Sequence, residues 1–156
     1  MRITTSWAMR WDDVIRDVIF PDEELASLMM IPENTDIITW VNKYFVDADM
    51  CTELVTDEDV RVLWYEEDSV SAANALVNRR RMAFDIYVKR DHLNDATNDL
   101  LQRRTKLISQ KLQEILTDKG IVGHIGFQYV DDYSLGTKMV GYVRHHLVVQ
   151  YLAGHK

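Results

Sequence analysis

The chain has 156 residues, 47% of them hydrophobic and 28% charged, with only 6 Gly and 2 Pro, which excludes a disordered chain and a fibrous repeat. No apolar run approaches the roughly 20 residues that span a bilayer, and no apolar signal core follows the N-terminus. The net charge of -7 argues against duplex DNA held by the whole surface, and the one cysteine, Cys51, allows no internal disulfide and fits a reducing cytosol.

The length fits a single domain. Residues 1–56 are expected to form a mainly helical N-terminal segment, and residues 57–156 a sheet with one long helix. Charge is distributed unevenly, because residues 1–70 hold 5 basic and 17 acidic side chains, whereas residues 71–156 hold 13 basic and 8 acidic ones. Two solvated faces would explain this asymmetry, and so would identical copies that pack acidic part against basic part.

Three short helices are predicted near the N-terminus. The first covers residues 11–20 and ends at the following proline, which cannot continue a helix. The acidic residues 22–24 favour the start of a second helix, which extends through Met30. Asp36 can cap a third segment over residues 37–45, although the β-branched and aromatic content of this segment also suits a strand.

Alternating apolar residues then predict two strands, over residues 60–65 and 82–89. In the second strand Met82, Phe84, Ile86 and Val88 are expected to point inward, and Ala83, Asp85, Tyr87 and Lys89 outward. Residues 66–81, between the strands, are expected to form a connection, which is longer than hairpin loops usually are. Its middle, residues 72–77, could instead extend the hairpin or form a helical turn.

A long amphipathic helix is predicted over residues 95–119. Asn94 or Asp95 can cap its start, and Gly120 ends it. Its apolar residues recur at spacings of three, four and seven, as expected of a helix that buries one broad face. They are Ala96, Leu100, Leu101, Leu107, Ile108, Leu112, Ile115 and Leu116.

A closing hairpin is predicted after this helix. Residues 120–126 lead into a strand around Tyr129, residues 131–138 supply a turn that contains Gly136, and residues 139–152 form a long strand. Strands beside helices that are segregated in sequence predict an α+β fold. We expect an antiparallel sheet of about four strands, packed by the one long amphipathic helix.

No motif for a catalyst, a metal or a cofactor stands out. Gly120, Gly123 and Gly126 follow a helix and precede a strand, the reverse of the order that binds an anion at a helix start. His145 and His146 are adjacent, so they should point to opposite faces of a strand and cannot easily share a metal. The sequence therefore predicts no enzyme, no metal site and no cofactor.

One enzymatic alternative nevertheless stays open. A metal-dependent nuclease needs two or three acids and a lysine at one sheet edge. Asp85 and Lys89 share one face of their strand, and Asp131 and Asp132 could approach from the closing hairpin. The spacing of Asp85 and Lys89 does not match the short acid-x-lysine motif of such enzymes.

The order of short helices, strand, long connection, strand, long helix and closing hairpin resembles the tail terminator (tail completion, or head-tail joining) proteins of long-tailed bacteriophages. This resemblance is carried by residues 60–65, 82–89, 95–119, 120–126 and 139–152. The helical start is longer than compact versions of that fold need.

The resemblance implies a structural protein of the virion neck or tail, assembled in the host cytoplasm. It would form a ring, typically a hexamer, that caps the tail tube and joins it to the head connector. The implied partners are copies of the same chain, the tail tube protein and the head-connector proteins, with DNA only as passing cargo and no membrane.

Contacts to a neighbouring copy or to the tube are predicted at the oppositely charged ends of the long connection. The predicted contact residues are Glu66, Glu67, Asp68, Arg79, Arg80 and Arg81. Two other functions remain as alternatives. One is a head-closure or adaptor subunit of the same neck, and the other is the small metal-dependent nuclease that would use the acidic clusters.

Overall fold

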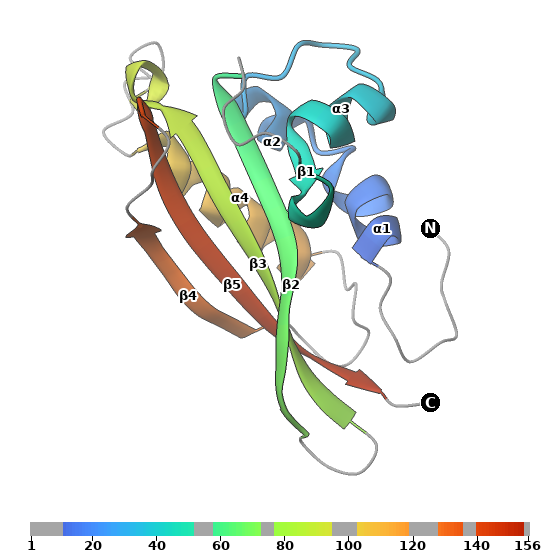
Figure 1. Cartoon of the computed structure of the whole chain (residues 1–156). Coiled ribbons are helices and arrows are strands. Elements are labelled where there is room, and N and C mark those ends of the chain that lie inside the picture. The colour runs from blue at the N-terminus through green and yellow to red at the C-terminus, as the bar shows by residue number, and fades with distance from the viewer. Residues whose placement is uncertain are drawn as a thin grey trace.

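The computed structural model describes residues 11–51, 58–72, 77–94, 103–118, 128–135 and 140–154. There a five-stranded sheet in the order β1-β2-β3-β5-β4 is packed by helices (Figure 1). The expected α+β class is confirmed, with one strand more than expected. The elements are α1 Trp11–Val14, η1 Ile15–Ile19, α2 Glu23–Leu28, α3 Ile37–Lys43, β1 Phe45–Asp47, η2 Ala48–Met50, β2 Val60–Ala72, β3 Val77–Lys89, η3 Arg90–His92, α4 Arg104–Asp118, β4 Gln128–Leu135 and β5 Tyr142–Gly154.

The three predicted N-terminal helices are present with their predicted starts. Residues 11–19 are helical throughout, because α1 continues as the π-helical turn η1. Asp22 caps α2 by accepting a hydrogen bond from the Leu25 backbone N–H (2.9 Å), and Asp36 caps α3 by accepting one from the Thr39 N–H (2.7 Å). Each cap pairs a donor that the first helical turn leaves without a partner.

The segment 37–45 is helical and turns into a strand only at its last residue. Phe45 opens β1, whose residues 45–47 pair in parallel with residues 62–64 of β2, so the sheet is mixed rather than purely antiparallel. β1 is short and β2 is long. Beyond Trp64, no strand of the described part of the chain pairs with the outer edge of β2.

The predicted connection over residues 66–81 is wrong, because β2 runs on to Ala72 and β3 begins at Val77. At the two ends of its middle, Ala72 and Val77 extend the hairpin as the alternative prediction has it, and residues 73–76 lie outside the described residues. Glu67 faces Arg81 across the hairpin. The segment has no apolar alternation to reveal a strand, and its pairing is completed by β5, whose residues 150–154 face the first five residues of β3.

Helix α4 begins later than predicted. Asn94, one of the two predicted caps, instead forms an antiparallel bridge with Arg103, and Arg104 is the first helical residue. Asp95 and Gly120 lie outside the described residues. In the described part of the chain no helix is both long and apolar enough to cross a membrane.

Arg104 ties the start of α4 to two other elements. Its buried side chain donates from Nε to the His92 carbonyl (2.8 Å) and from Nη1 to the Leu28 carbonyl (2.9 Å), at the ends of η3 and α2. Charge-assisted hydrogen bonds of this kind are stronger than neutral ones. Contacts to residues so distant in sequence, rather than a local cap, fix where the helix starts.

The predicted turn over residues 131–138 is wrong over residues 131–135, which belong to β4, and residues 136–138 lie outside the described residues. Asp131 and Asp132 belong to β4, which pairs antiparallel with β5 and carries an irregularity between Tyr129 and Asp131. Aspartate is depleted in strands, so two in succession favour a turn prediction. The predicted strand entry, residues 120–126, lies outside the described residues.

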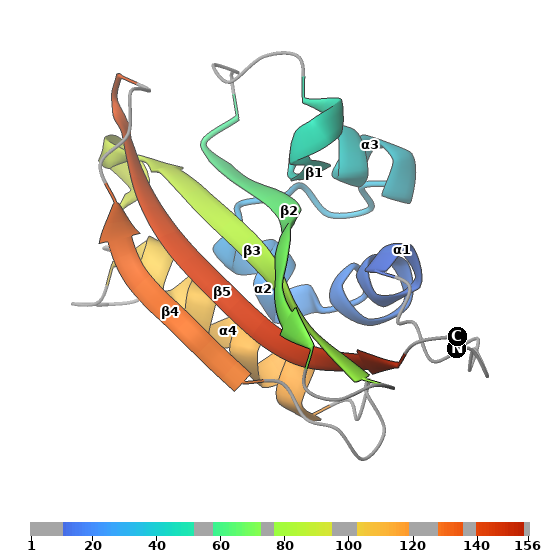
Figure 2. The ribbon, with the colours of Figure 1, turned by 60° about the horizontal axis from the view of Figure 1, so that its bottom comes forward.

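The core lies between one face of the sheet and the helices, with α4 along β3 and β5 and with α1 and α3 near β1 and β2 (Figure 2). The predicted inward residues of β3 are confirmed, since all four are at most 1% exposed. The outward prediction is partly wrong, because Ala83, Asp85 and Tyr87 are buried as well. The apolar stripe of α4 is buried at Ile108, Leu112, Ile115 and Leu116.

Candidate functional site

The six predicted contact residues lie on the facing strands of the β2–β3 hairpin. Glu66 is exposed, and Glu67 and Arg81 are half-buried. The Arg81 Nε donates to the side-chain oxygen of Gln150 on β5 (3.3 Å). The side chains of the other three, Asp68, Arg79 and Arg80, lie outside the described part. The two charged clusters are therefore brought together in one hairpin, and their role in contacts stays a prediction.

A buried ionic cluster occupies the sheet face that points away from α4. The Asp85 carboxylate contacts the His146 Nδ1 (2.5 Å) and the Arg144 Nη2 (3.1 Å), and the His146 Nε2 lies 3.8 Å from a Glu67 oxygen. Burial, and then the charge of Asp85, raise the pKa of the Tyr65 hydroxyl beside it. Both ring nitrogens of His146 face carboxylates, one from β3 and one from β2, so the cluster holds β2, β3 and β5 together.

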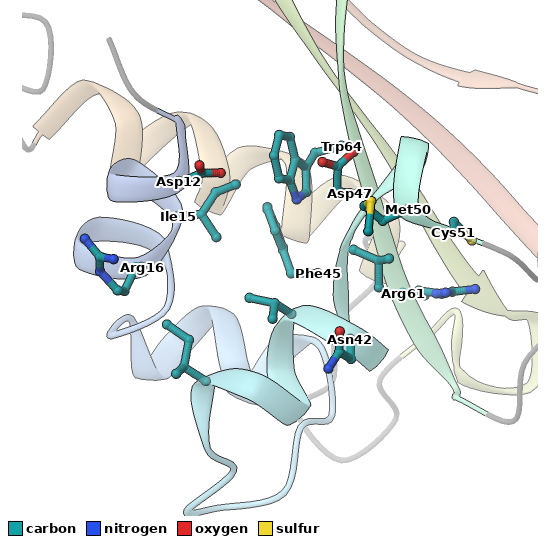
Figure 3. A pocket seen from close by; sticks show the side chains of 13 residues that line it. Asp12, Ile15, Arg16, Asn42, Phe45, Asp47, Met50, Cys51, Arg61 and Trp64 are labelled. Atoms are coloured by element: carbon teal, nitrogen blue, oxygen red, sulfur yellow. The ribbon is translucent and has the colours of Figure 1, made fainter.

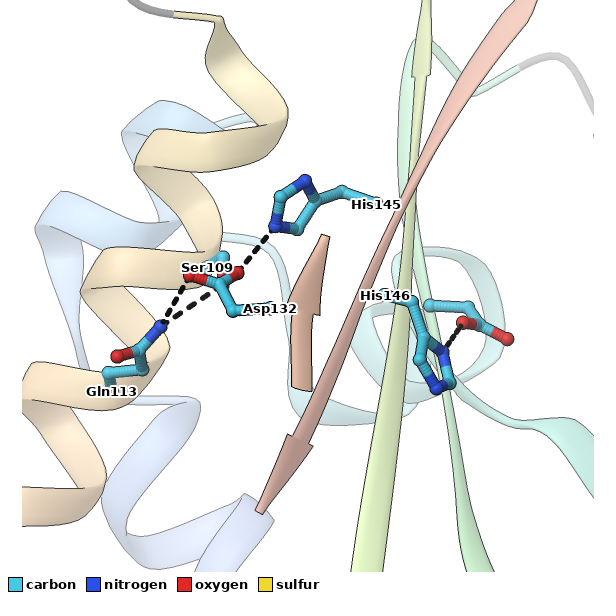
Figure 4. Close-up of polar contacts among 6 residues, drawn as sticks. Ser109, Gln113, Asp132, His145 and His146 are labelled. Carbon is cyan, nitrogen blue, oxygen red and sulfur yellow. Dashed lines mark hydrogen bonds and ion pairs between the residues drawn. The ribbon is translucent and has the colours of Figure 1, made fainter. Parts of the chain in front are cut away.

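A second polar cluster lies on the opposite face, between β4, β5 and α4 (Figure 4). One oxygen of Asp132 contacts the His145 Nε2 (2.5 Å) and accepts a hydrogen bond from the Ser109 hydroxyl (2.7 Å). The other accepts one from the Gln113 amide (3.3 Å). Ser109 and Gln113 are one helical turn apart, so this cluster fixes the face that α4 presents to the sheet. The prediction that His145 and His146 point to opposite faces is confirmed.

The contacts of Asp132 make part of the stability depend on pH. Burial alone would raise the pKa of Asp132, but hydrogen bonds from His145 and Ser109 outweigh it and hold this pKa below its ordinary value of 3.8. A carboxyl group whose pKa is lower in the folded than in the unfolded state stabilises the folded chain. This stabilisation is complete above the unfolded-state pKa, and it is lost as the pH falls through the folded-state pKa. We therefore expect Asp132→Asn to lower the urea midpoint at neutral pH, and the difference from wild type to disappear below the carboxyl range.

The matched control for this pH dependence is Asp131→Asn, which removes the neighbouring carboxylate of β4. It should leave the urea midpoint at neutral pH close to that of wild type, because no hydrogen bond or ion pair of the Asp131 side chain is found among the described residues. A difference between Asp132→Asn and wild type that stays constant from neutral to strongly acidic pH would contradict the assignment of this stability to the Asp132 charge.

A groove opens where α1, α3 and η2 meet the edge formed by β1 and β2 (Figure 3). Its volume is about 570 Å³. Ile15, Val41 and Phe45 give it apolar walls, and the charged residues along it include Arg16 and Arg61. The groove is open to solvent and is formed by elements that are distant in sequence.

The groove shares Asp12, Asp47 and Trp64 with a smaller hollow of about 310 Å³, which lies where β1 ends and β2 runs on. We call this hollow the acidic notch. Its lining holds four carboxylates and, among the described residues, no basic side chain. The residues that line the notch are Trp11, Asp12, Asp47, Asp49, Trp64, Tyr65, Glu66 and Met82.

The same elements define the part of the chain that comparison with known proteins recognises. A protein-family model described as YomW matches residues 15–148, from η1 into β5 and thus across the whole sheet. The chain belongs to the YomW family. No curated protein matches this YomW-family chain.

Among solved structures, the YomW-family chain is similar to a chain from a structure described as the virion of a native gene transfer agent (GTA) particle. The match covers 90% of this chain and 92% of that chain, with a TM-score of 0.54 and 16% sequence identity. At this level of identity the likeness establishes a shared fold over nearly the full length of both chains.

In this YomW-family chain, two acids of the nuclease hypothesis, Asp85 and Asp132, lie on opposite faces of the sheet. Asp85 lies on the face away from α4, Asp132 lies on the face that α4 covers, and Lys89 pairs with Asp59 (3.5 Å). Among the described residues, no group of three or more His, Cys, Asp or Glu side chains is placed to hold a metal ion. The arrangement that metal-dependent cleavage requires is therefore not formed by these acids.

Neither the notch nor the two polar clusters is predicted by the sequence. The notch joins side chains from α1, the β1–η2 corner and β2, and no spacing in the sequence relates them. One local signal does exist for the cluster on α4. Ser109 and Gln113 stand one turn apart beside an apolar stripe, which indicates a polar partner on the surface that the helix covers.

Proposed function

We propose that this chain is a structural protein of a phage virion and acts as a tail terminator, as a ring of identical copies that caps the tail tube and joins it to the head connector. The observation that carries the proposal is the fold, shared over 90% of this chain with a chain of a GTA virion. Such a protein functions by binding to copies of itself, to the tube protein and to the connector proteins.

The distribution of charge supports a ring around passing DNA. The first 70 residues hold 17 acidic and only 5 basic side chains, so a bore lined by this part of the chain would repel the DNA backbone rather than bind it. The more basic remainder offers a surface of opposite sign for contact between copies.

The proposal is tested first in solution. The purified chain should form a particle whose mass is several times the subunit mass of 18.3 kDa, either alone or once the mass of bound tube protein is subtracted, as measured by light scattering or native mass spectrometry. A strict monomer at every concentration, with and without the tube protein, would contradict it.

Deletion of the gene tests the position in the neck. Loss of a tail terminator should give tails of uncontrolled length that are not joined to heads, as seen by negative-stain electron microscopy. Tails of normal length that remain separate from heads would contradict the capping role and point to the head side of the neck. Virions of normal form and infectivity would contradict a structural role altogether.

A further inference from the structure

We infer that the acidic notch of one copy receives a basic surface of a second copy, so that identical subunits join head to tail. The basic surface, called here the basic flank, consists of Arg90, Arg103 and Lys106. This inference rests on the proposed ring and names the two surfaces that would close it.

The chemistry of the notch fits a long cationic side chain. Two indole rings, those of Trp11 and Trp64, line it together with the carboxylates of Asp12, Asp47, Asp49 and Glu66. Trp11 is buried in the core, whereas Trp64 is half-buried, so the methylene groups of an arginine or a lysine can lie along the Trp64 ring while the charged end reaches the carboxylates. Asp12 and Asp49 are exposed, so these carboxylates are accessible to a partner from solvent.

The basic flank is exposed and compact. Arg90 belongs to η3, Arg103 precedes α4 directly, and Lys106 lies one turn further along the helix. Backbone hydrogen bonds hold the two elements together, since the Leu93 N–H donates to the Arg90 carbonyl and the Arg104 N–H to the Leu93 carbonyl. Within the described residues, no carboxylate forms an ion pair with any of the three cations.

The two surfaces lie on different sides of the molecule. In both views α1 and β1 lie on one side, and the start of α4 and the turn that follows β3 lie on the other (Figures 1 and 2). A two-fold contact through the notch alone would place carboxylates against carboxylates, which is unfavourable. Contact between the notch and the basic flank is heterologous, and heterologous contacts generate rings when the rotation closes.

Charge reversal in the full-length chain tests the pairing. One variant, Asp49→Lys with Glu66→Lys, reverses two of the four carboxylates of the notch and leaves it without net charge. A second, Arg103→Glu with Lys106→Glu, reverses two of the three cations of the flank. Acids at the start of α4 suit the helix dipole, so the second variant should remain folded. The control, Glu23→Lys with Glu33→Lys, makes the same change of charge at exposed acids outside the notch. Circular dichroism confirms that every variant is folded.

Each reversal is expected to raise the protein concentration at half-assembly by more than about tenfold, because like charges would then face each other. The control should assemble like wild type. The chain that carries all four substitutions of the notch and flank, and an equal mixture of the two reversed variants, should both regain assembly. High salt should weaken assembly of the wild type.

The outcomes separate this inference from the proposed ring. If wild type forms a ring and both reversed variants assemble equally well, the contact lies elsewhere, so the pairing is wrong while the ring stands. If both reversed variants fail to assemble and the chain with all four substitutions, shown to be folded, does not regain assembly, the notch and the flank do not face each other. If wild type itself stays monomeric, alone and with the tube protein, the ring and the pairing both fail.

Discussion

Replacing Phe45 by alanine is expected to lower the free energy of unfolding by about 3–5 kcal/mol, the usual cost of truncating a buried phenylalanine. Phe45 is fully buried, with 0% exposure, at the first residue of β1. Its ring stacks on Trp40 of α3 (centroids 4.9 Å apart, planes at 4°) and contacts Phe84 of β3 (6.0 Å). The substitution would open a cavity where α3, β1 and β3 meet.

Urea denaturation followed by far-UV circular dichroism measures this loss, since the fluorescence of Trp40 would itself change in the variant. The matched control is Ile38→Ala on α3, where the side chain is 69% exposed and the expected change is within about 0.5 kcal/mol. Equal losses in the two variants would contradict the placement of Phe45 at the centre of the core.

Replacing Asp85 by alanine is expected to cost about 2–4 kcal/mol. Breaking a buried ion pair by removing one partner typically costs 3–5 kcal/mol, because the other charge is left buried without compensation. Here the Arg144 side chain retains 25% exposure, which reduces the cost, whereas the Asp85 and His146 side chains are only 7% and 8% exposed. The same urea titration at neutral pH measures the change.

Two further variants show whether the loss of stability in Asp85→Ala comes from the missing charge. Asp85→Asn keeps a hydrogen-bond acceptor but removes the charge, and should recover part of the loss. Glu114→Ala removes a carboxylate that is 62% exposed and 3.4 Å from Lys111, and should change stability by no more than about 1 kcal/mol. If Asp85→Ala is as mild as Glu114→Ala, the Asp85 cluster is solvated and does not join the strands.

Local pattern in the sequence identified the elements whose formation depends on residues close along the chain. Asp36 is read as a helix cap because a cap acts within three residues, and the structure confirms it. The acidic residues 22–24 are read as the start of a helix, which is confirmed as well, and the structure adds that Asp22 caps it. The alternation over residues 82–89 and the apolar stripe of α4 reveal buried faces directly, because the periods of strand and helix place those residues on one side. The fold class followed from the order of these elements.

The tertiary structure decided the features that depend on partners distant in sequence. The basic end of the β2–β3 hairpin, residues 79–81, is a strand because β5 pairs with it, and the acidic end pairs in turn with β3. Asp132 lies in β4 because His145, Ser109 and Gln113 satisfy its carboxylate there. The notch exists because β1 stops while β2 continues. The hydrophobic period of a segment shows whether a residue faces the core but not which strand lies beside it. Sequence alone therefore determined the three N-terminal helices, the apolar face of α4, the central strands and the fold class. The start of α4, the length of the hairpin, the polar clusters and the notch were determined only by the folded chain.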